Sequence, residues 1–292
     1  MRLAILASVS ALSLLLQLSP APAADRVAIV AAENFYGELA REIGGKSVDV
    51  TSILSNPDDD PHLFETSPST ARAIAHADVV IFNGAGYDGW MQKLLAASTS
   101  EKRDVIVAAK LVGAHDGDNP HLWYKPATLP AVAAKLTASL AKADPADAPR
   151  FRANLAYFDE SFGKIVDRIA EMKKRLGGAD VTATEPVFGY MIQALGLEDH
   201  NQAFQLAMMN DTEPSPRSVA DFEKSLKDGT VKILFYNRQV SDATTSRLLD
   251  IAKANKVAVV GVTETMPAGK TIVSWFTGQL DKVDQALGKK TN

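Results

Sequence analysis

Two histidines of this sequence follow prolines in closely similar surroundings. His62 lies in residues 60–64 (DPHLF), and His121 lies in residues 119–123 (NPHLW). The proline restricts the backbone before each imidazole, and the bulky residues after it can hold the ring in one orientation, as a metal ligand requires. A lone loop histidine is more often a structural residue, but this chain has only five histidines. The matched pair therefore predicts two imidazole ligands of a metal ion.

Two glutamates follow apolar runs that we expect to be strands. Glu185 comes directly after residues 181–184, and Glu264 comes shortly after 257–262. The carboxyl ends of parallel strands share one edge of a sheet, and ligands of α/β proteins bind there. Two imidazoles with carboxylate oxygens suit Zn²⁺, Mn²⁺ or Fe²⁺. The alternative for either glutamate is an interaction with a helix N-terminus.

The other three histidines stand in settings that predict no ligand. His76 falls in an alanine-rich helical pattern, and His115 falls in a short polar loop. His200 comes at the expected exit of a helix, where it can interact with the helix end. We expect all three to be surface or structural residues.

Composition excludes several classes of protein. The chain has 292 residues with 46% hydrophobic and 23% charged residues, which is enough to bury a core and is untypical of a disordered chain. A net charge of -4 argues against nucleic acid as a partner. Cysteine is absent, so the chain has no disulfide, no thiol nucleophile and no lipid-modified cysteine.

The first 24 residues have the pattern of a signal peptide. Arg2 is followed by an apolar run and then by small residues, as a signal peptidase requires. The apolar run is shorter than the roughly 20 residues that span a bilayer, so an anchor is the weaker interpretation. We expect export to the periplasm, with cleavage near Ala23 or Ala24.

The remaining chain alternates between short apolar runs and helical patterns, which is typical of parallel βα units. The fold class predicted is α/β, with two lobes that each have a central, mostly parallel sheet flanked by helices. The expected strands are 27–32, 48–54, 78–83, 105–109, 181–184, 232–236 and 257–262.

One long helix is expected between the two halves. From Phe151 to Leu176 apolar residues recur at spacings of three and four, and two glycines follow. A helix over 149–176 would be about 40 Å long. We interpret it as a rigid connector rather than a core helix of one domain. The expected organisation is a signal peptide (1–24), an N-terminal α/β lobe (25–145), a connecting helix (146–178) and a C-terminal α/β lobe (179–292).

On these motifs the chain resembles the solute-binding proteins of zinc and manganese ABC importers, over nearly the whole mature sequence. The resemblance implies two α/β lobes bridged by one helix, with a single metal ion in the cleft. It implies that His62 and His121 are the ligands of the N-terminal lobe. Glu185 matches a third position, where zinc carriers usually have histidine and manganese carriers glutamate. Glu264 matches a fourth position that is normally aspartate.

The sequence does not decide which metal ion binds. Carboxylates can bind through both oxygens and raise the coordination number, which manganese prefers, and the resemblance also favours manganese. Zinc nevertheless binds most such sites more tightly, and ferrous iron is a further candidate. Asn237 and Glu213 are alternative donors if Glu264 does not bind directly.

The function expected from the sequence is a monomeric capture protein, not an enzyme, which delivers the ion to an inner-membrane ABC permease. The alternatives are a carrier of an organic solute, a secreted metallohydrolase or a surface interaction protein. Four protein ligands would leave no place for the activated water of a hydrolase. An organic-solute carrier predicts a larger cleft lined by aromatic residues.

Overall fold

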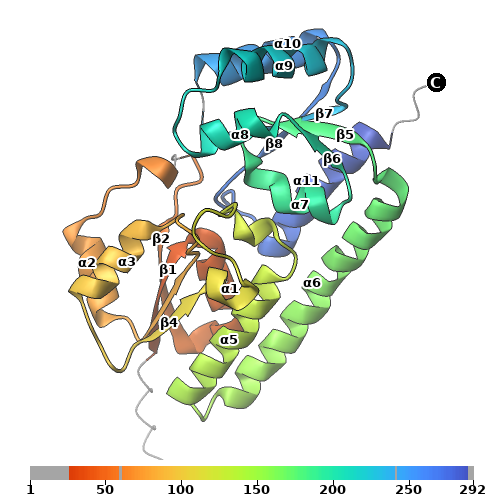
Figure 1. Ribbon diagram of the computed structural model, residues 1–292. Helices are drawn as coiled ribbons and strands as arrows, with labels where there is room; N and C mark the ends of the chain where they lie inside the picture. The colour runs from red at the N-terminus through yellow and green to blue at the C-terminus, as the bar shows by residue number, and fades with distance from the viewer. Residues whose placement is uncertain (1–25, 59–60, 241, 289–292) are drawn as a thin grey trace, which may run out of the picture.

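The structure, a computed structural model, describes residues 26–58, 61–240 and 242–288; the expected signal peptide lies outside them. This part of the chain forms two four-stranded parallel sheets in two lobes (Figure 1). The strand orders are β2-β1-β3-β4 and β6-β5-β7-β8. The strands are β1 (Val27–Glu33), β2 (Val48–Leu54), β3 (Val79–Phe82), β4 (Asp104–Val107), β5 (Asp180–Ala183), β6 (Glu198–His200), β7 (Ile233–Asn237) and β8 (Ala258–Val262).

Helices cover both faces of each sheet. The first lobe contains α1 (Asn34–Gly44), α2 (Pro68–His76), α3 (Gly89–Ala97), α4 (Ala108–Val112) and α5 (Thr128–Ala143), and is followed by α6 (Ala148–Leu176). The second contains α7 (Gly189–Ala194), α8 (Gln202–Met209), α9 (Pro216–Lys227), α10 (Ala243–Ala254) and α11 (Ile272–Leu287). Short 3-10 turns are η1 (Gly45–Ser47), η2 (Pro61–Leu63), η3 (Leu122–Tyr124) and η4 (Pro186–Phe188).

The seven expected strands are all present, and their ends differ from the expected ones by at most two residues. The eighth strand, β6, was not expected, and His200 lies in it rather than at a helix exit. Its three residues, Glu-Asp-His, carry no apolar signal because β6 is a short edge strand. His200 pairs there with Asp180 of β5, with Nε2 2.7 Å from Oδ1.

The continuous apolar run of β1 reflects helices on both sides of the first sheet. Ile29 and Ala31 pack in the core that includes residues of α1 and α5. Val30 and Ala32 pack on the opposite face, against residues of α2 and α3.

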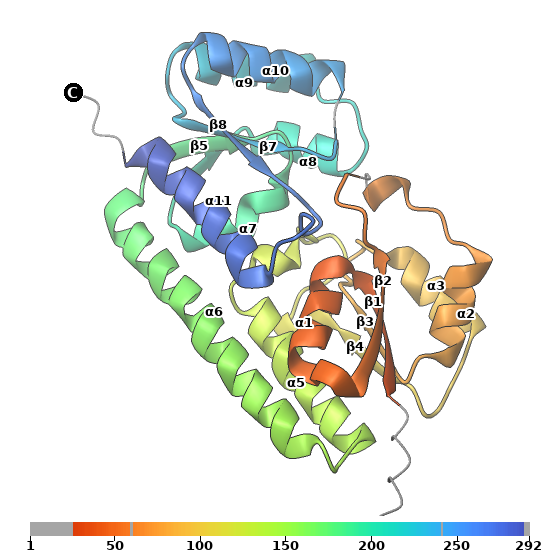
Figure 2. The same ribbon diagram turned by 180° about the vertical axis from the view of Figure 1, so that it is seen from behind.

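The long helix α6 runs beside both lobes (Figures 1 and 2). It contacts α1 and α5 of the first lobe and α7 and α11 of the second. The expected apolar stripe is its buried face, from Phe151 through Phe162 to Leu176. The connector interpretation is therefore confirmed. Neither α6 nor any other helix within the described ranges combines the length and apolar character needed to cross a bilayer.

One hydrophobic core continues across both lobes. It joins Phe35 and Trp123 of the first lobe to Trp275 of the second, with Phe35 and Trp275 ring centroids 5.9 Å apart. Polar contacts lie beside it: the Asn34 amide donates to the Met266 carbonyl (2.8 Å) and accepts from the Met266 backbone N–H (2.9 Å). The lobes are therefore packed against each other rather than linked only by α6.

Truncating the buried face of α6 should destabilise the whole protein. Phe162 is 1% exposed and contacts the rings of Phe158 and Phe276. We expect Phe162→Ala to lower the free energy of unfolding by about 3–5 kcal/mol, because it leaves a cavity between the lobes. Urea unfolding measures this. Val166→Ala, at an exposed position of the same helix, should change it by less than about 0.5 kcal/mol; equal effects would contradict the shared core.

Candidate metal site

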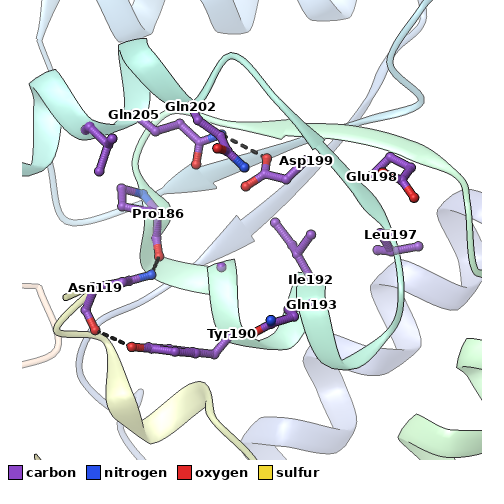
Figure 3. A pocket seen from close by; sticks show the side chains of 12 residues that line it. Asn119, Pro186, Tyr190, Ile192, Gln193, Leu197, Glu198, Asp199, Gln202 and Gln205 are labelled. Atoms are coloured by element: carbon purple, nitrogen blue, oxygen red, sulfur yellow. Dashed lines mark hydrogen bonds between the residues drawn. The ribbon is translucent and has the colours of Figure 1, made fainter. Parts of the chain in front are cut away.

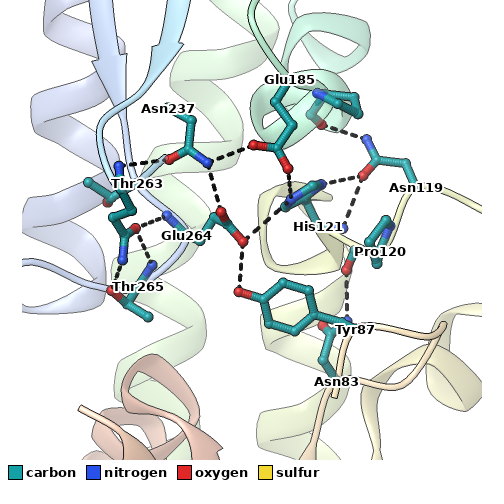
Figure 4. A network of polar contacts seen from close by, with 12 residues as sticks. Asn83, Tyr87, Asn119, Pro120, His121, Glu185, Asn237, Thr263, Glu264 and Thr265 are labelled. Carbon is teal, nitrogen blue, oxygen red and sulfur yellow. Dashed lines mark hydrogen bonds and ion pairs between the residues drawn. The ribbon is translucent and has the colours of Figure 1, made fainter. Parts of the chain in front are cut away.

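His121 is fully buried just before η3, and Asn119 fixes the state of its ring (Figure 4). The Asn119 Nδ2 donates to the Pro186 carbonyl (2.7 Å), which can only accept, so the amide orientation is set. The Asn119 Oδ1 lies 2.6 Å from His121 Nδ1 and therefore accepts its proton. With the proton on Nδ1 held in this way, Nε2 is the ring nitrogen that faces the interior, as in a metal-binding imidazole.

Two buried glutamates face this nitrogen from the second lobe. Glu185 follows β5 and Glu264 follows β8, and they are 5% and 0% exposed. Nε2 of His121 lies 3.9 Å from Oε1 of Glu185 and 3.7 Å from Oε2 of Glu264. The three residues each offer one candidate ligand atom, and these atoms lie within 4.8 Å of one another. The two glutamates thus lie close together, as their places after parallel strands predicted.

Neutral donors support the two carboxylates (Figure 4). The Tyr87 hydroxyl donates to Oε2 of Glu264 at 2.9 Å. Burial and the Glu264 carboxylate raise the pKa of Tyr87, so the hydroxyl keeps its proton. The Nδ2 of Asn237 donates to both Glu185 and Glu264.

The arrangement suits a divalent cation. Two carboxylates buried close together are electrostatically unfavourable without a compensating positive charge. Two atoms that each lie about 2.1 Å from one ion can be at most about 4.2 Å apart, and both His121–glutamate separations meet this limit. A nitrogen with carboxylate oxygens is a donor set for zinc, manganese or ferrous iron.

The structure places the other residues singled out in the sequence as follows. The backbone of His62 lies in η2, but its side chain is outside the described part of the structure. Glu213 is exposed in the loop before α9 and does not join the cluster. Asn237 does lie at the site, where its amide nitrogen donates to the two glutamates. His76 and His115 are exposed, as expected.

Sequence reasoning missed a second pair of acids near the site. Glu33 ends β1, and Asp88 accepts hydrogen bonds from the backbone of Asn83 and Gly84 after β3. Both are fully buried. Burial, and then the Asp88 carboxylate, raise the pKa of Glu33 well above its ordinary value; burial raises the pKa of Asp88 to about 6. Glu33 ends β1 and Asp88 lies in the loop after the neighbouring strand β3, and these positions could have identified the pair from the sequence.

A surface pocket of about 440 Å³ lies beside the cluster, behind Asn119 (Figure 3). Its lining combines Tyr190 with amides and acids such as Gln205 and Asp199, and burial raises the pKa of Asp199 to about 6. Trp123 and Trp275 are buried in the core. Trp90 packs near Phe64, with ring centroids 4.5 Å apart, and lines a different surface pocket.

The sequence is similar to those of known metal-binding and metal-uptake proteins. A family model described as the periplasmic component A of zinc-uptake complexes matches residues 29–286. The manganese-binding lipoprotein MntA of Bacillus subtilis is 28% identical over 244 residues, which cover 78% of this chain and 76% of that protein. The iron ABC transporter substrate-binding lipoprotein MtsA of Streptococcus pyogenes is 23% identical, covering 91% and 90%.

The fold matches solved structures as well. The periplasmic zinc-binding protein TroA of Treponema pallidum superposes with a TM-score of 0.76 at 18% identity, covering 90% of this chain and 99% of that one. A mutant of the laminin-binding adhesin Lmb of Streptococcus agalactiae gives a TM-score of 0.74 at 22% identity, covering 89% and 99%. These likenesses establish the two-lobed architecture.

Removing the support of the histidine should weaken metal binding. In Asn119→Ala, Nδ1 of His121 loses its acceptor, and the ring no longer has one enforced orientation. We expect affinity for Zn²⁺ or Mn²⁺ to fall about 10–100-fold, measured by titration of the metal-free protein. Asn154→Ala, which removes an amide donor to Ile43 far from the cluster, is the control. Equal affinities in the wild type, Asn119→Ala and Asn154→Ala would show that Asn119 does not support metal binding.

The buried acid pair should make stability depend on pH. A carboxyl group with a raised pKa in the folded state binds more protons than in the unfolded state, so stability falls as pH rises from about 4 through the folded pKa. Glu33→Gln cannot ionise, and should therefore gain at least about 1 kcal/mol over the wild type between pH 5 and pH 8. Urea unfolding at both pH values tests this, with the exposed Glu101→Gln as control; a pH-independent difference for Glu33→Gln would contradict it.

Proposed function

The chain belongs to the family of the periplasmic component A of zinc-uptake complexes, and we propose that it captures one divalent transition metal ion between its lobes and delivers it to an ABC importer. Its relatives include substrate-binding lipoproteins of manganese and iron ABC transporters. It is a substrate-binding protein and not an enzyme. The metal ion is its cargo.

The observation that carries this proposal is the buried cluster of His121, Glu185 and Glu264. The imidazole comes from the first lobe and both carboxylates come from the second, so an ion bound to all three lies between the lobes. Their burial favours an ion over a hydrated solute, because the facing atoms of His121 and the two glutamates are only 3.7 and 3.9 Å apart.

We assign His62 as the fourth ligand. It follows β2, and the residues on either side of it, Pro61 and Leu63, line a pocket together with Thr265. Thr265 comes directly after Glu264. The backbone around His62 therefore shares a pocket with the residue that follows Glu264, which supports a complete set of His62, His121, Glu185 and Glu264.

The proposal also covers the mature chain, its lobes and its partner. The proposed mature protein begins after cleavage near Ala23 or Ala24 and works as a periplasmic monomer with lobes 25–145 and 179–292 joined by 146–178. Its partner is an inner-membrane ABC permease. Manganese, zinc and ferrous iron are the cargo ions that this donor set admits.

The direct test is metal analysis of the mature protein. Protein purified from a periplasm without chelator should hold one ion per chain, and the stripped form should bind Zn²⁺ and Mn²⁺. His121→Ala should lower the affinity by more than about 100-fold, because it removes the nitrogen ligand that the first lobe contributes to the cluster. His115→Ala, at an exposed histidine, should leave it unchanged. No retained ion and no binding by the wild type would overturn the proposed function.

A further inference from the structure

The surface pocket behind Asn119 is built mainly from the second lobe. Apart from Asn119, its lining comes from η4, α7, the segment around β6, and α8 (Figure 3). Its volume of about 440 Å³ falls within the range of small-molecule sites, about 300–1,000 Å³. His121, Glu185 and Glu264 are not among the lining residues. The pocket is therefore separate from the metal cluster.

Gln205 of α8 brings a hydrogen-bond acceptor to this pocket. Its Nε2 donates to Oδ1 of Asp199 and to the carbonyl of His200, both at 2.8 Å, and so uses both of its hydrogens. The orientation of the amide is therefore fixed, with Oε1 as the remaining polar atom. Gln205 is 1% exposed, and no group of the described residues donates to Oε1. Because a buried acceptor without a donor is unfavourable, this oxygen favours a ligand that carries N–H groups.

Two carboxylates give the pocket a negative charge. Glu198 and Asp199 are consecutive residues of β6, and both line it. Burial raises the pKa of Asp199 to about 6, so its carboxylate is charged at pH 7. The neighbouring His200 faces Asp180, with Nε2 2.7 Å from Oδ1. Within the described chain neither Glu198 nor Asp199 forms an ion pair with lysine or arginine, so the pocket favours a cation as its ligand.

Apolar groups complete the lining. Ile192 and Tyr190 of α7 lie across the pocket from Gln205 and Asp199 in Figure 3. The Tyr190 hydroxyl donates to the carbonyl of Asn119 at 2.8 Å, so the ring is held in position. A short aliphatic chain therefore has apolar surface to contact, opposite the Asp199 carboxylate and the Gln205 oxygen.

We propose that this pocket is a second binding site of the protein, which takes a small primary ammonium ion with an aliphatic chain. The ammonium donates to Asp199 and to Oε1 of Gln205, and the chain packs against Tyr190 and Ile192. A primary ammonium carries three donors and no acceptor, which matches these groups. The same carboxylates disfavour an anion. The site does not depend on the proposed function, since it uses none of the residues of the metal cluster.

The probe for this site is n-butylammonium, and its binding is followed by the backbone amide signals of the protein in NMR spectra. We expect saturable shifts for residues of β6 and α8. Two further probes need no variant: n-butanol has the same chain without the charge, and tetramethylammonium has the charge without N–H donors. Both should bind at least about tenfold more weakly, because they lose the charge-assisted hydrogen bonds.

Asp199→Asn tests the carboxylate at nearly constant size. It should lower the affinity for n-butylammonium at least about tenfold, since it removes the charge that the ammonium contacts. Asp250→Asn, at an exposed position of α10 in the same lobe, removes an equal charge and should bind as the wild type does. The circular dichroism spectra of both variants should match that of the wild type.

The outcomes separate this site from the proposed function. A wild type without saturable shifts in n-butylammonium would overturn the second site. Equal affinities for n-butylammonium and n-butanol would do the same, as would an unchanged affinity in a correctly folded Asp199→Asn protein. A wild type that binds n-butylammonium but no metal would support the second site and overturn the proposed function.

Discussion

Two carboxylates buried against one imidazole are the constraint on which the rest of this structure depends. Charge of one sign concentrated in a dry interior is unfavourable, so the neighbouring groups have to hold it in place. Asn237 and Tyr87 do so with neutral donors, and Asn119 keeps the imidazole in the form that accepts a cation. Each of these three groups comes from a loop or a strand end, and the sheets keep those ends at fixed positions.

The sequence predicted most of the fold because its signals are local. Apolar runs marked seven strands, and the stripe from Phe151 to Leu176 marked α6 with nearly correct ends. The strand β6 was missed since an edge strand of three polar residues lacks that signal. His200 was consequently misplaced.

The candidate site was only partly predictable, because its supports are distant in sequence. Glu185 and Glu264 could be found from their places after strands. Tyr87, however, is 177 positions from the Glu264 that it supports, and nothing in the spacing of the chain indicates the contact. Asn237 was recognised as a polar residue of the site, but its action as a donor depends on an amide orientation set by Gln239.

The core that continues across the lobes has a mechanical consequence. Opening the protein like a hinge would expose the contact between Phe35 and Trp275 to water and break the pair of hydrogen bonds between Asn34 and Met266. At about 25 cal/mol for each Å² of apolar surface, even a modest opening costs several kcal/mol. Thermal motion alone therefore opens such a protein rarely. If an ion between the lobes leaves through such an opening, a partner that binds both lobes has to supply this free energy.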